Sequence, residues 1–431
     1  MTKAALILVL AGLALSLPVA AVLAITGYVL SDNYAFMPMT GAAGHLAWSH
    51  SNDFILIAAP MFIMMGELMH RSGVSERLFG ALAPWFARVP GQLIHTNIAS
   101  SAVFAATSGS SLATAATIGT VAVPNMDKGG YNRPLFLGSI AAGGTLGILI
   151  PPSINMIVYS VLSHTSVVDL YAAGFIPGFL LAALFSGIVL VSVLVMPSLV
   201  RGKPADGTLW PARLAGLPHL LPPLGLFFVV VGSIYVGLAT PTEAAALGLI
   251  ATLALVALNG KLSIPVLLSA FEGTVRTTCM ILLIVLTAFF LNLVMVSIGL
   301  VDAITAEILA LGWSPLGMLL AIIAFYLVLG CFMETISMMI ATTPIIVPVI
   351  VGLGFDPVWW GIVFVILIEA ALITPPVGLN LYIVQAVRKS GSISDLFIGS
   401  IPFLIAMLAM IAALIVFPQL ALWLPEIVNP K

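Results

Sequence analysis

The sequence predicts an all-α protein that crosses a membrane many times, and three observations lead to this fold class. Apolar residues make up 61% of the 431-residue chain and charged residues 7%, against roughly 25% charged residues in a soluble domain. The mean hydropathy is +1.22. Long apolar runs recur along the chain at about the 20-residue length of a membrane-spanning helix. A formal net charge of −2 provides no basic field for a nucleic-acid partner.

Nine apolar runs are long enough to predict crossings. They cover residues 4–30, 54–70, 135–163, 170–198, 219–238, 244–258, 278–297, 359–388 and 396–420. Lys3 precedes the first run as in a cleaved signal peptide, but the run continues to Leu30, so we interpret it as an uncleaved first span. Amphipathic stretches that are predicted to lie along the membrane surface cover residues 72–88, 263–277 and 300–312.

Residues 92–126 and 315–350 form two further regions with a polar centre. Lys and Arg accumulate in cytoplasmic loops, and if each region returns to the side it came from, 13 of the 14 basic residues share one face. These are Lys3, Arg71, Arg77, Arg88, Lys128, Arg133, Arg201, Lys203, Arg213, Lys261, Arg276, Arg388 and Lys389, with Lys431 alone opposite. Arms of roughly 15 to 17 residues are too short for a core of roughly 30 Å, so we expect two re-entrant hairpins. The same count predicts a cytoplasmic N-terminus and a periplasmic C-terminus.

The chain repeats itself at an offset of 224 to 226 residues. The repeated positions pair Gly73 with Gly299, Gly91 with Gly317, Pro124 with Pro348, Pro151 with Pro375, Pro152 with Pro376 and Asp169 with Asp395. Such an ordered series indicates an internal duplication. Because five passages of the bilayer separate residues 54–70 from their partner at 278–297, the copies are predicted to be upside down relative to each other. Inverted repeats with interrupted helices are typical of secondary transporters, whose site lies near the membrane midplane.

Two polar tips and two proline breaks predict the binding site. The tips are Thr107–Ser111 and Met333–Ser337, and the crossings that follow them contain Pro151-Pro152 and Pro375-Pro376. Proline removes a backbone donor, so both helices are predicted to break inside the membrane and to turn carbonyl groups toward a cavity. Carbonyl and hydroxyl oxygens suit a small hard cation such as sodium, and half-helix N-termini suit an anionic substrate.

Several polar residues have a second explanation. A single Ser, Thr or Gly in a membrane helix can simply allow close packing. Glu334 and Glu369 are predicted to be buried carboxylates, either functional or held as neutral acids for structure, and Glu67 and His70 are interpreted as interfacial residues rather than a metal pair. The residues that could orient a substrate or simply pack are Asn155, Asn380, Tyr159 and Tyr382. Since the chain has no HExxH, GxSxG or GxxxxGK motif, we expect no enzyme.

Three stretches resemble a known family. The tip TSGSSLATAAT and the breaks GGTLGILIPPSINMIVY and ITPPVGLNLYIV resemble the large membrane subunit of tripartite ATP-independent periplasmic (TRAP) transporters, the DctM-like family of the ion transporter superfamily. The resemblance covers essentially the whole chain. It implies an elevator-type transporter for sodium-coupled uptake of a small organic acid, a carboxylate or sulfonate, across the bacterial inner membrane. It also implies two or more Na⁺ ions, no transition metal and no organic cofactor.

The resemblance further implies partners and site residues. The partners are a periplasmic substrate-binding protein and a separate small four-helix membrane subunit, in addition to the lipid bilayer. The expected sodium-binding residues are Ser108, Gly109, Ser110, Gly144, Gly147 and Pro151 at the first site, and Glu334, Thr335, Ile373, Thr374 and Pro376 at the second. The expected substrate-binding residues are Ser111, Thr114, Ser153, Asn155, Ser337, Gly378 and Asn380. No Lys or Arg is among them, so the sequence does not specify which acid is carried.

The predicted domain organisation alternates scaffold and transport segments. Residues 1–53 are the first span and an interfacial segment, 54–91 a scaffold span and arm, 92–163 the first hairpin and broken helix, 164–314 further scaffold and arm helices, 315–388 the second hairpin and broken helix, and 389–431 the final span. The alternative function is a stand-alone sodium-coupled carboxylate or anion transporter of the same superfamily. A passive channel or a membrane scaffold protein is the third possibility.

Overall fold

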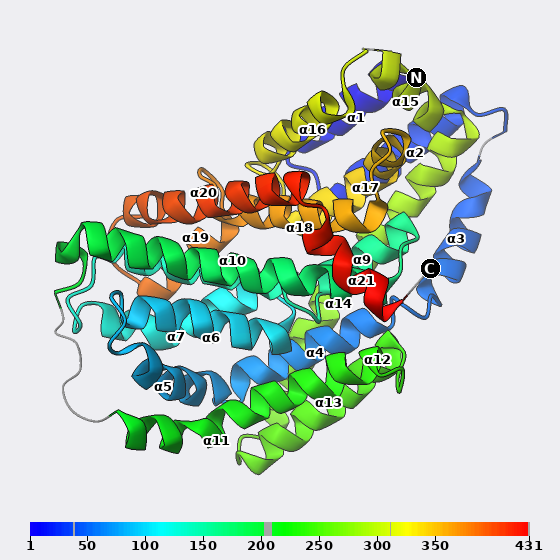
Figure 1. Cartoon of the computed structure of the whole chain (residues 1–431). Helices are drawn as coiled ribbons and strands as arrows, with labels where there is room; N and C mark the ends of the chain where they lie inside the picture. The colour runs from blue at the N-terminus through cyan, green and yellow to red at the C-terminus, as the bar shows by residue number, and fades with distance from the viewer. Residues whose placement is uncertain (38, 202–208, 311, 430–431) are drawn as a thin grey trace.

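The computed structural model describes residues 1–37, 39–201, 209–310 and 312–429. In this part of the chain the regular secondary structure is helical, and one isolated antiparallel bridge joins Tyr131 and Val200. Most of the helices run along one common direction (Figure 1). A membrane core requires every backbone polar group to bond within its own segment, which helices achieve. The predicted all-α polytopic class is confirmed, whereas Lys203 and Lys431 of the charge count lie outside the described residues.

Four helices in the first half of the chain begin at a polar capping residue. Ser110, Asn132, Ser153 and Ser166 each accept a bond from a backbone N–H in the first turn that follows, which explains where these helices start. The elements are α1 (Thr2–Ala14), α2 (Val19–Tyr34), η1 (Met39–Gly41), α3 (Ala42–Ser51), α4 (Ala58–Arg71), α5 (Val74–Phe86), α6 (Leu93–Ser108), α7 (Ser111–Met126), α8 (Arg133–Leu149), α9 (Ile154–Ser163), α10 (Val167–Val195) and η2 (Pro197–Leu199).

The second half also contains side-chain caps. Thr240 and Glu243 form a capping box at the start of α13, and Ser314 and Asp356 cap α16 and α18. The elements are α11 (Trp210–Phe227), η3 (Phe228–Gly232), α12 (Ser233–Tyr235), α13 (Pro241–Leu258), α14 (Ile264–Ser297), α15 (Leu300–Ala310), α16 (Pro315–Leu329), α17 (Thr335–Gly352), α18 (Pro357–Ile373), α19 (Leu379–Arg388), α20 (Ser394–Val416) and α21 (Gln419–Val428).

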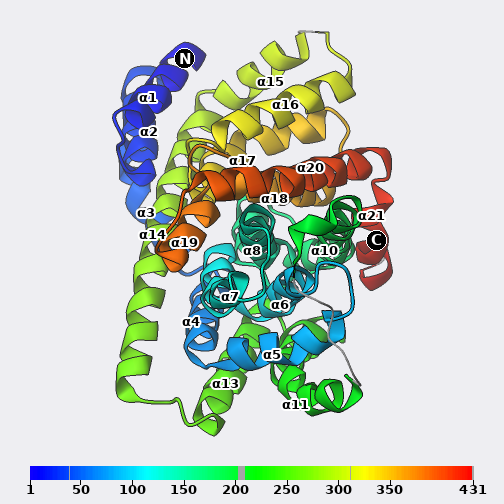
Figure 2. The same ribbon diagram turned by 90° about the vertical axis from the view of Figure 1, so that its left-hand side faces the viewer.

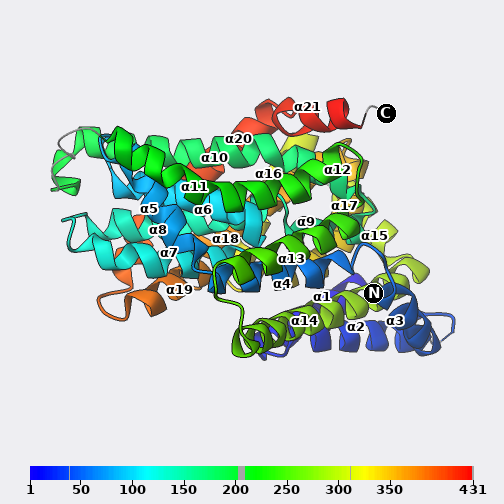
Figure 3. The same ribbon diagram turned by 90° about the horizontal axis from the view of Figure 1, so that it is seen from below.

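A central bundle surrounds α8. This helix contacts α6, α7, α10, α18 and α20, and Figure 2 shows it enclosed by them. Large side chains such as Trp360, Tyr159 and Phe136 are fully buried here. The helices α4, α11, α13 and α14 lie outside the bundle, and α2 and α3 pack on α14 at one edge of the molecule (Figure 3).

The two halves repeat the same local geometry, which supports the predicted duplication. Gly73 and Gly299 both have a positive φ, as do His164 and Lys389, which are 225 residues apart. The two halves also make matching contacts with each other. α7 of the first half packs on α19 of the second, and α17 of the second half packs on α9 of the first. Each half therefore contributes one polar tip and one broken helix to the same bundle.

The predicted single first span is wrong, because α1 and α2 fold back on one another. Ser16 has a φ of 56°, and Pro18 precedes the first turn of α2. A Cβ on Gly12 would lie 2.8 Å from a methyl carbon of Val22. In a straight helix these residues would be about 15 Å apart, so the segment is a helical hairpin.

Both ends of this hairpin lie near the end of α14. Thr2 lines the same cavity as Leu300, and the Ser297 hydroxyl contacts the Met39 sulfur at 2.9 Å. Figure 1 shows α1 and α21 at the end of the molecule opposite α5 and the start of α11. Lys3 is therefore separated from the other basic residues, which removes the basis for the predicted cytoplasmic N-terminus.

The predicted arm at 263–277 is not a separate element. It continues into the crossing at 278–297 as the single 34-residue helix α14. The other two predicted arms do form short helices, α5 and α15. A periodic amphipathic pattern cannot reveal whether a surface segment bends away from the next span, since both are helical.

Fewer helices than the predicted nine are long and apolar enough to cross a membrane. Among the described residues six qualify, and the pair α8 and α9, bent by 44°, makes a seventh. α4, with 14 residues, and the interrupted pair α18 and α19 fall short. The first hairpin arms, α6 and α7, have 16 residues each, while α17 reaches 18. The re-entrant geometry of the hairpins stays a prediction.

Candidate functional site

The first tip is a tight turn between α6 and α7. α6 ends at Ser108, and Gly109 follows in the left-handed region with a φ of 61°, where glycine avoids the steric cost of a Cβ. Ser110 is extended, and its hydroxyl accepts from the backbone N–H of Ala113 at 3.4 Å. The short sequence Ser-Gly-Ser therefore ends one helix, reverses the chain and caps the next.

Glycines let this tip lie directly against the first proline break. A Cβ on Gly109 would lie 2.8 Å from the carbonyl oxygen of Pro152, and one on Gly147 would lie 2.6 Å from that of Ser110. Gly144 is equally close to α7. Real side chains do not approach this closely, so glycine is required at these positions. Pro151 was predicted as a sodium-binding residue, whereas the carbonyl group that lies beside the tip belongs to Pro152. A double-proline motif does not indicate which of its two carbonyl groups faces the tip.

Hydroxyl groups complete the first tip. The Ser108 and Thr114 hydroxyl oxygens are 2.8 Å apart, and the Thr114 hydroxyl donates to the carbonyl oxygen of Ser110 at 2.8 Å. The structure thus brings Ser108, Ser110 and Thr114 together with Gly147. Thr114, which the sequence assigns to the substrate, is bonded within the tip itself.

The other predicted substrate residues of the first half line the same break. The Ser153 hydroxyl accepts from the backbone N–H of Met156 at 3.4 Å, and Ser111 is buried at the start of α7. Asn155 is also buried, and its side-chain Nδ2 has no hydrogen-bond partner. Buried donors are nearly always bonded, so this amide is a candidate ligand-binding group.

The second tip is organised around Glu334. Its carboxylate accepts from the backbone N–H groups of Ile336 at 3.0 Å and Ser337 at 2.9 Å, and the Thr335 hydroxyl donates to it at 3.0 Å. The side chain is half-buried and caps α17. Glu334 was predicted to be a buried carboxylate, and its burial is only partial; its carboxylate bonds to the N-terminus of α17.

The second break is only partly assembled with this tip. The Cys331 thiol lies 3.7 Å from the carbonyl oxygen of Pro375, and the Thr374 hydroxyl donates to Ala370 of its own helix at 2.6 Å. Among the described residues no hydrogen bond joins Glu334 or Thr335 to the break. Ile373 is buried, whereas Pro376 is exposed. Both proline pairs contain a cis peptide bond.

Asn380 links the second break to the first half of the chain. It is fully buried, and its Nδ2 donates to the carbonyl oxygen of Ala141 in α8 at 3.1 Å, while its Oδ1 has no partner. Gly378 precedes it with a φ of 24°. Ser337 is buried at the start of α17, but the structure records no contact between it and Asn380.

Glu369 lies fully buried on α18, and neither carboxylate oxygen has a hydrogen-bond partner. The prediction of a buried carboxylate is confirmed for this residue. It is 224 residues from Thr145 of α8, so the two occupy corresponding places before the two breaks. A buried acid without partners is costly when ionised.

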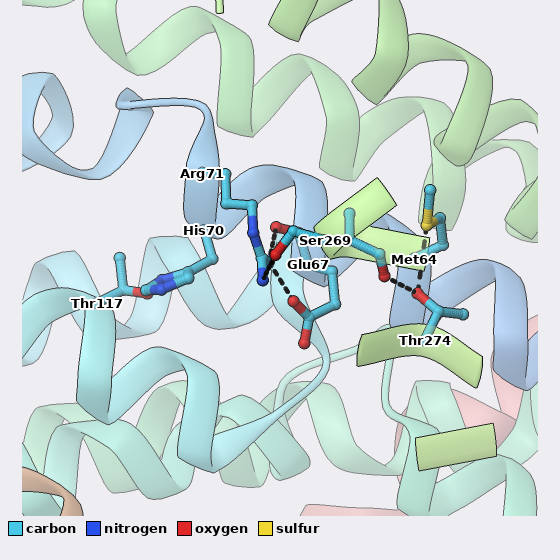
Figure 4. Close-up of polar contacts among 8 residues, drawn as sticks. Met64, Glu67, His70, Arg71, Thr117, Ser269 and Thr274 are labelled. Carbon is cyan, nitrogen blue, oxygen red and sulfur yellow. Dashed lines mark hydrogen bonds and ion pairs between the residues drawn. The ribbon is translucent and has the colours of Figure 1, made fainter. Parts of the chain in front are cut away.

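The helix α4 contacts both the first hairpin and α14 (Figure 4). Arg71 pairs with Glu67 and donates to the Ser269 hydroxyl of α14 at 3.1 Å. His70 hydrogen-bonds to Thr117 of α7. A Cβ on Gly66 would lie 2.6 Å from the carbonyl oxygen of Ser108 in the first tip. The four-residue spacing of Gly66 and His70, which places both on one helix face, is the sequence signal for this contact.

The arrangement at the first tip suits a small hard cation. Carbonyl and hydroxyl oxygens from α6, α7 and the break converge in a buried region, and neither tip nor either break contains Lys or Arg. The N-termini of α7 and α9 begin here, and their dipoles favour negative charge nearby. The same place can therefore hold a cation and the anion that accompanies it.

Comparison with known proteins adds family information to this geometry. The family model described as "Tripartite ATP-independent periplasmic transporter, DctM component" matches residues 6–420. The C4-dicarboxylate TRAP transporter large permease protein DctM of Pseudomonas aeruginosa is 34% identical over 384 residues, covering 87% of each chain. The sialic acid TRAP transporter large permease protein SiaM of Vibrio cholerae is 31% identical, also covering 87% of each chain.

A solved structure supports the fold independently. The crystal structure of the Alcanivorax borkumensis YdaH transporter matches with a TM-score of 0.61 and covers 97% of this chain and 98% of its own. The sequence identity is 16%, so this likeness concerns the fold alone.

Proposed function

The chain belongs to the family of DctM components of tripartite ATP-independent periplasmic transporters, and from that premise we propose that it carries a small organic acid into a bacterial cell, driven by sodium. The permease relatives named above carry C4-dicarboxylates and sialic acid. A carboxylate is therefore the substrate class that the relatives favour. The chemistry of the first tip supports sodium as the coupling ion.

The observation that carries the proposal is the convergence of oxygens at the first tip. The carbonyl groups of Ser110 and Pro152 approach glycines across the break, and the Ser108 and Thr114 hydroxyls lie beside them. Oxygen ligands without a basic side chain suit Na⁺. Gly109, Gly144 and Gly147 serve by leaving room for the backbone.

A second sodium ion is proposed between the second tip and its break. Glu334 and Thr335 would contribute there together with the backbone from Ile373 to Pro376, which requires the tip to approach the break more closely. The substrate lies between the two tips, where the N-termini of α7 and α17 face it. Asn155 and Asn380, each with an unbonded side-chain atom, are the residues best suited to orient its carboxylate.

The contacts support a division into a fixed and a moving part. The moving part consists of α6–α10 and α16–α20, which pack on one another around α8. This includes α10 and α20, which the sequence-based domain boundaries placed elsewhere. The fixed scaffold consists of α1–α4 and α11–α14, with α5 and α15 as connecting arms. The contact of α4 with the first tip is one place where the two parts meet.

The partners and the orientation follow from the family. A periplasmic substrate-binding protein delivers the acid, and a small membrane subunit accompanies this chain in the bacterial inner membrane. The basic loops face the cytoplasm. Because the N-terminus lies at the end away from those loops, both chain termini face the periplasm.

Transport by the reconstituted complex tests the proposal. The large and small membrane subunits are placed in liposomes, and the binding protein is added with a radiolabelled dicarboxylate or sialic acid. We expect uptake with an inward sodium gradient and none when choline replaces sodium. Equal uptake in both would refute sodium coupling, and uptake by this chain without the other two proteins would favour the stand-alone transporter.

A further inference from the structure

A cavity of about 490 Å³ lies between the N-terminal hairpin and the second half of the chain. Its walls come from α1 and α2 on one side, from α14 and α15 at the back, and from α16 and α17 on the other side. Representative lining residues are Leu6, Leu10, Leu23, Phe325 and Ile345. Of the described lining residues Met333 belongs to the second tip, and none belongs to the breaks.

The cavity walls contain few groups that could form hydrogen bonds with water. Three lining residues are polar, namely Thr2, Thr26 and Thr342, and no described lining residue is charged. Thr342 is already bonded, since it donates to the Met338 carbonyl at 2.7 Å and accepts from the Tyr326 hydroxyl at 2.6 Å. A buried water needs two to four polar partners. A space of this size and polarity suits hydrocarbon rather than water.

The cavity opens toward the bilayer. Leu6, Leu10 and Phe325 line it and are 59%, 53% and 51% exposed, and exposed apolar side chains that cluster on a membrane protein face lipid. The hydrocarbon that is always present at such an opening is lipid. The longest run outside the described residues, 202–208, is polar.

The end of the cavity near the N-terminus has the charge that a phospholipid headgroup requires. Lys3 is exposed and follows Thr2, which lines the cavity. It lies in the first turn of α1, where the helix dipole also favours an anion. Asp302 is exposed on α15, two residues from the lining residues Leu300 and Ile304, so it projects from another face of that helix.

We propose that this cavity binds one acyl chain of a bilayer phospholipid, with the lipid phosphate beside Lys3. The acyl chain lies between the N-terminal hairpin on one side and α16 and α17 on the other. On the proposed function, which this step requires, the second hairpin moves relative to α1 and α2. The bound acyl chain then lies at the boundary between the moving and the fixed part, so replacing it with another lipid changes the rate of transport.

Photocrosslinking tests the binding directly. The complex of large and small subunits is reconstituted with phosphatidylglycerol that carries a diazirine in the middle of one acyl chain. After illumination, modified peptides are mapped by mass spectrometry. We expect adducts in the peptides that contain Leu6 and Ile345, at a level above those in lipid-facing α10, which includes the exposed Val191 and Leu194.

Two tryptophan variants of α16 supply a matched comparison. Ala321 lines the cavity, whereas Ala324 is exposed on the same helix and does not. Ala321→Trp should lower the adducts at Leu6 and Ile345 by about tenfold, the change expected when about two methylene groups lose their place. Ala324→Trp should leave them unchanged. Ala341→Phe, on α17 at the same side of the cavity, repeats the test if the first variant does not fold.

The headgroup contact is tested with Lys3→Gln. This variant should lower labelling by the anionic lipid severalfold and leave labelling by a diazirine diacylglycerol unchanged.

Three results would overturn the lipid site. These are adducts no more frequent than on α10, adducts unaffected by Ala321→Trp, or zero-length crosslinks that place a helix of the small subunit in the cavity. Sodium-driven uptake is measured on the same preparations. If labelling follows the expected pattern while the wild-type complex shows no sodium-dependent uptake, the proposed function fails and the lipid site stands.

Discussion

The two tips occupy corresponding places in the repeat, yet they are packed very differently. The first is enclosed: Ser108 is 1% exposed, and every residue from 150 to 160 is buried. The second is open, with Phe332 73% exposed and Pro376 and Val377 at the surface. The same combination of polar turn and double proline is present in both.

The difference shows what turns a polar tip into a binding cradle. In the first half, Gly109 and Gly147 allow carbonyl groups to approach across the break. In the second half, Glu334 occupies the start of α17 and bonds to its own helix. The proline motif produces the break in each half, but glycines on both sides of the gap are what bring the backbones together. The following predictions test that contrast, beginning with the largest effect.

Adding a single methyl group at the enclosed tip should have the largest effect. In Gly147→Ala the new Cβ would lie 2.6 Å from the Ser110 carbonyl oxygen and 2.9 Å from the Thr114 hydroxyl. Overpacking of this kind costs about 1–3 kcal/mol, which predicts an apparent sodium affinity about 5- to 150-fold lower in uptake assays. Gly187→Ala is the control, because a Cβ there meets nothing within 4 Å. Unchanged sodium dependence in Gly147→Ala would show that the close approach is not part of the site.

The open tip should be less sensitive. Glu334→Ala removes the cap of α17, a loss of about 1 kcal/mol, which corresponds to about a fivefold decrease in sodium-dependent uptake. Glu334→Gln keeps one acceptor oxygen and should fall between this variant and the wild type. Initial uptake rates over a range of sodium concentrations measure both. Glu272→Ala, at an exposed ion pair with Arg276 on α14, is the control.

The outcome at Glu334 also distinguishes a cap from an ion ligand. If Glu334→Gln and Glu334→Ala are impaired equally, the negative charge is what matters, and the carboxylate acts on the ion. A wild-type rate in Glu334→Ala would contradict any role for the residue in the second tip.

The smallest effect is expected at Glu369, where an acidic residue in one half corresponds to a hydroxyl residue in the other. Glu369 stands in the second half where Thr145 stands in the first. An ionised carboxylate with neither oxygen bonded would cost several kcal/mol, so the neutral acid is the stable form, and Glu369→Gln has the same shape. Uptake and the thermal unfolding midpoint should stay within about twofold and a few degrees of the wild type. A folded Glu369→Gln protein that transports more than tenfold more slowly would instead show that the carboxyl group gains or loses a proton during transport.

The sequence predicted the features that depend on local chemistry. Membrane helices followed from hydropathy, the breaks from Pro151-Pro152 and Pro375-Pro376, and the first tip from Ser108 to Ser111. The repeat was visible because glycine and proline positions constrain the backbone and so persist at a fixed offset. The turn, the helix cap and the close-packed glycines of the first tip could therefore be predicted from local sequence, whereas their role in sodium binding stays a proposal.

The features that depend on packing could not be predicted. A hydropathy window treats residues 4–30 as one run and gives no weight to the turn at Ser16 and Pro18, which reverses the chain. Glu334 and Glu369 look alike in sequence, but one lies at a helix start with free N–H groups and the other in the middle of a buried helix. The spacing of Gly66 and His70 places both on one face of α4, but which helix that face contacts depends on the placement of two helices, which the spacing does not specify.

The length of α14 connects the protein to the thickness of its membrane. At 1.5 Å per residue its 34 residues measure about 51 Å, and even a tilt of about 40° leaves a projection of about 39 Å across a hydrocarbon layer of roughly 30 Å. At least one end of this helix must lie among the lipid headgroups. The exposed ion pair of Arg276 and Glu272 would be hydrated there. In a thicker bilayer this end would lie within the hydrocarbon layer, and the ion pair would lose its hydration. The stability of the scaffold should therefore depend on the lipid composition of the host membrane.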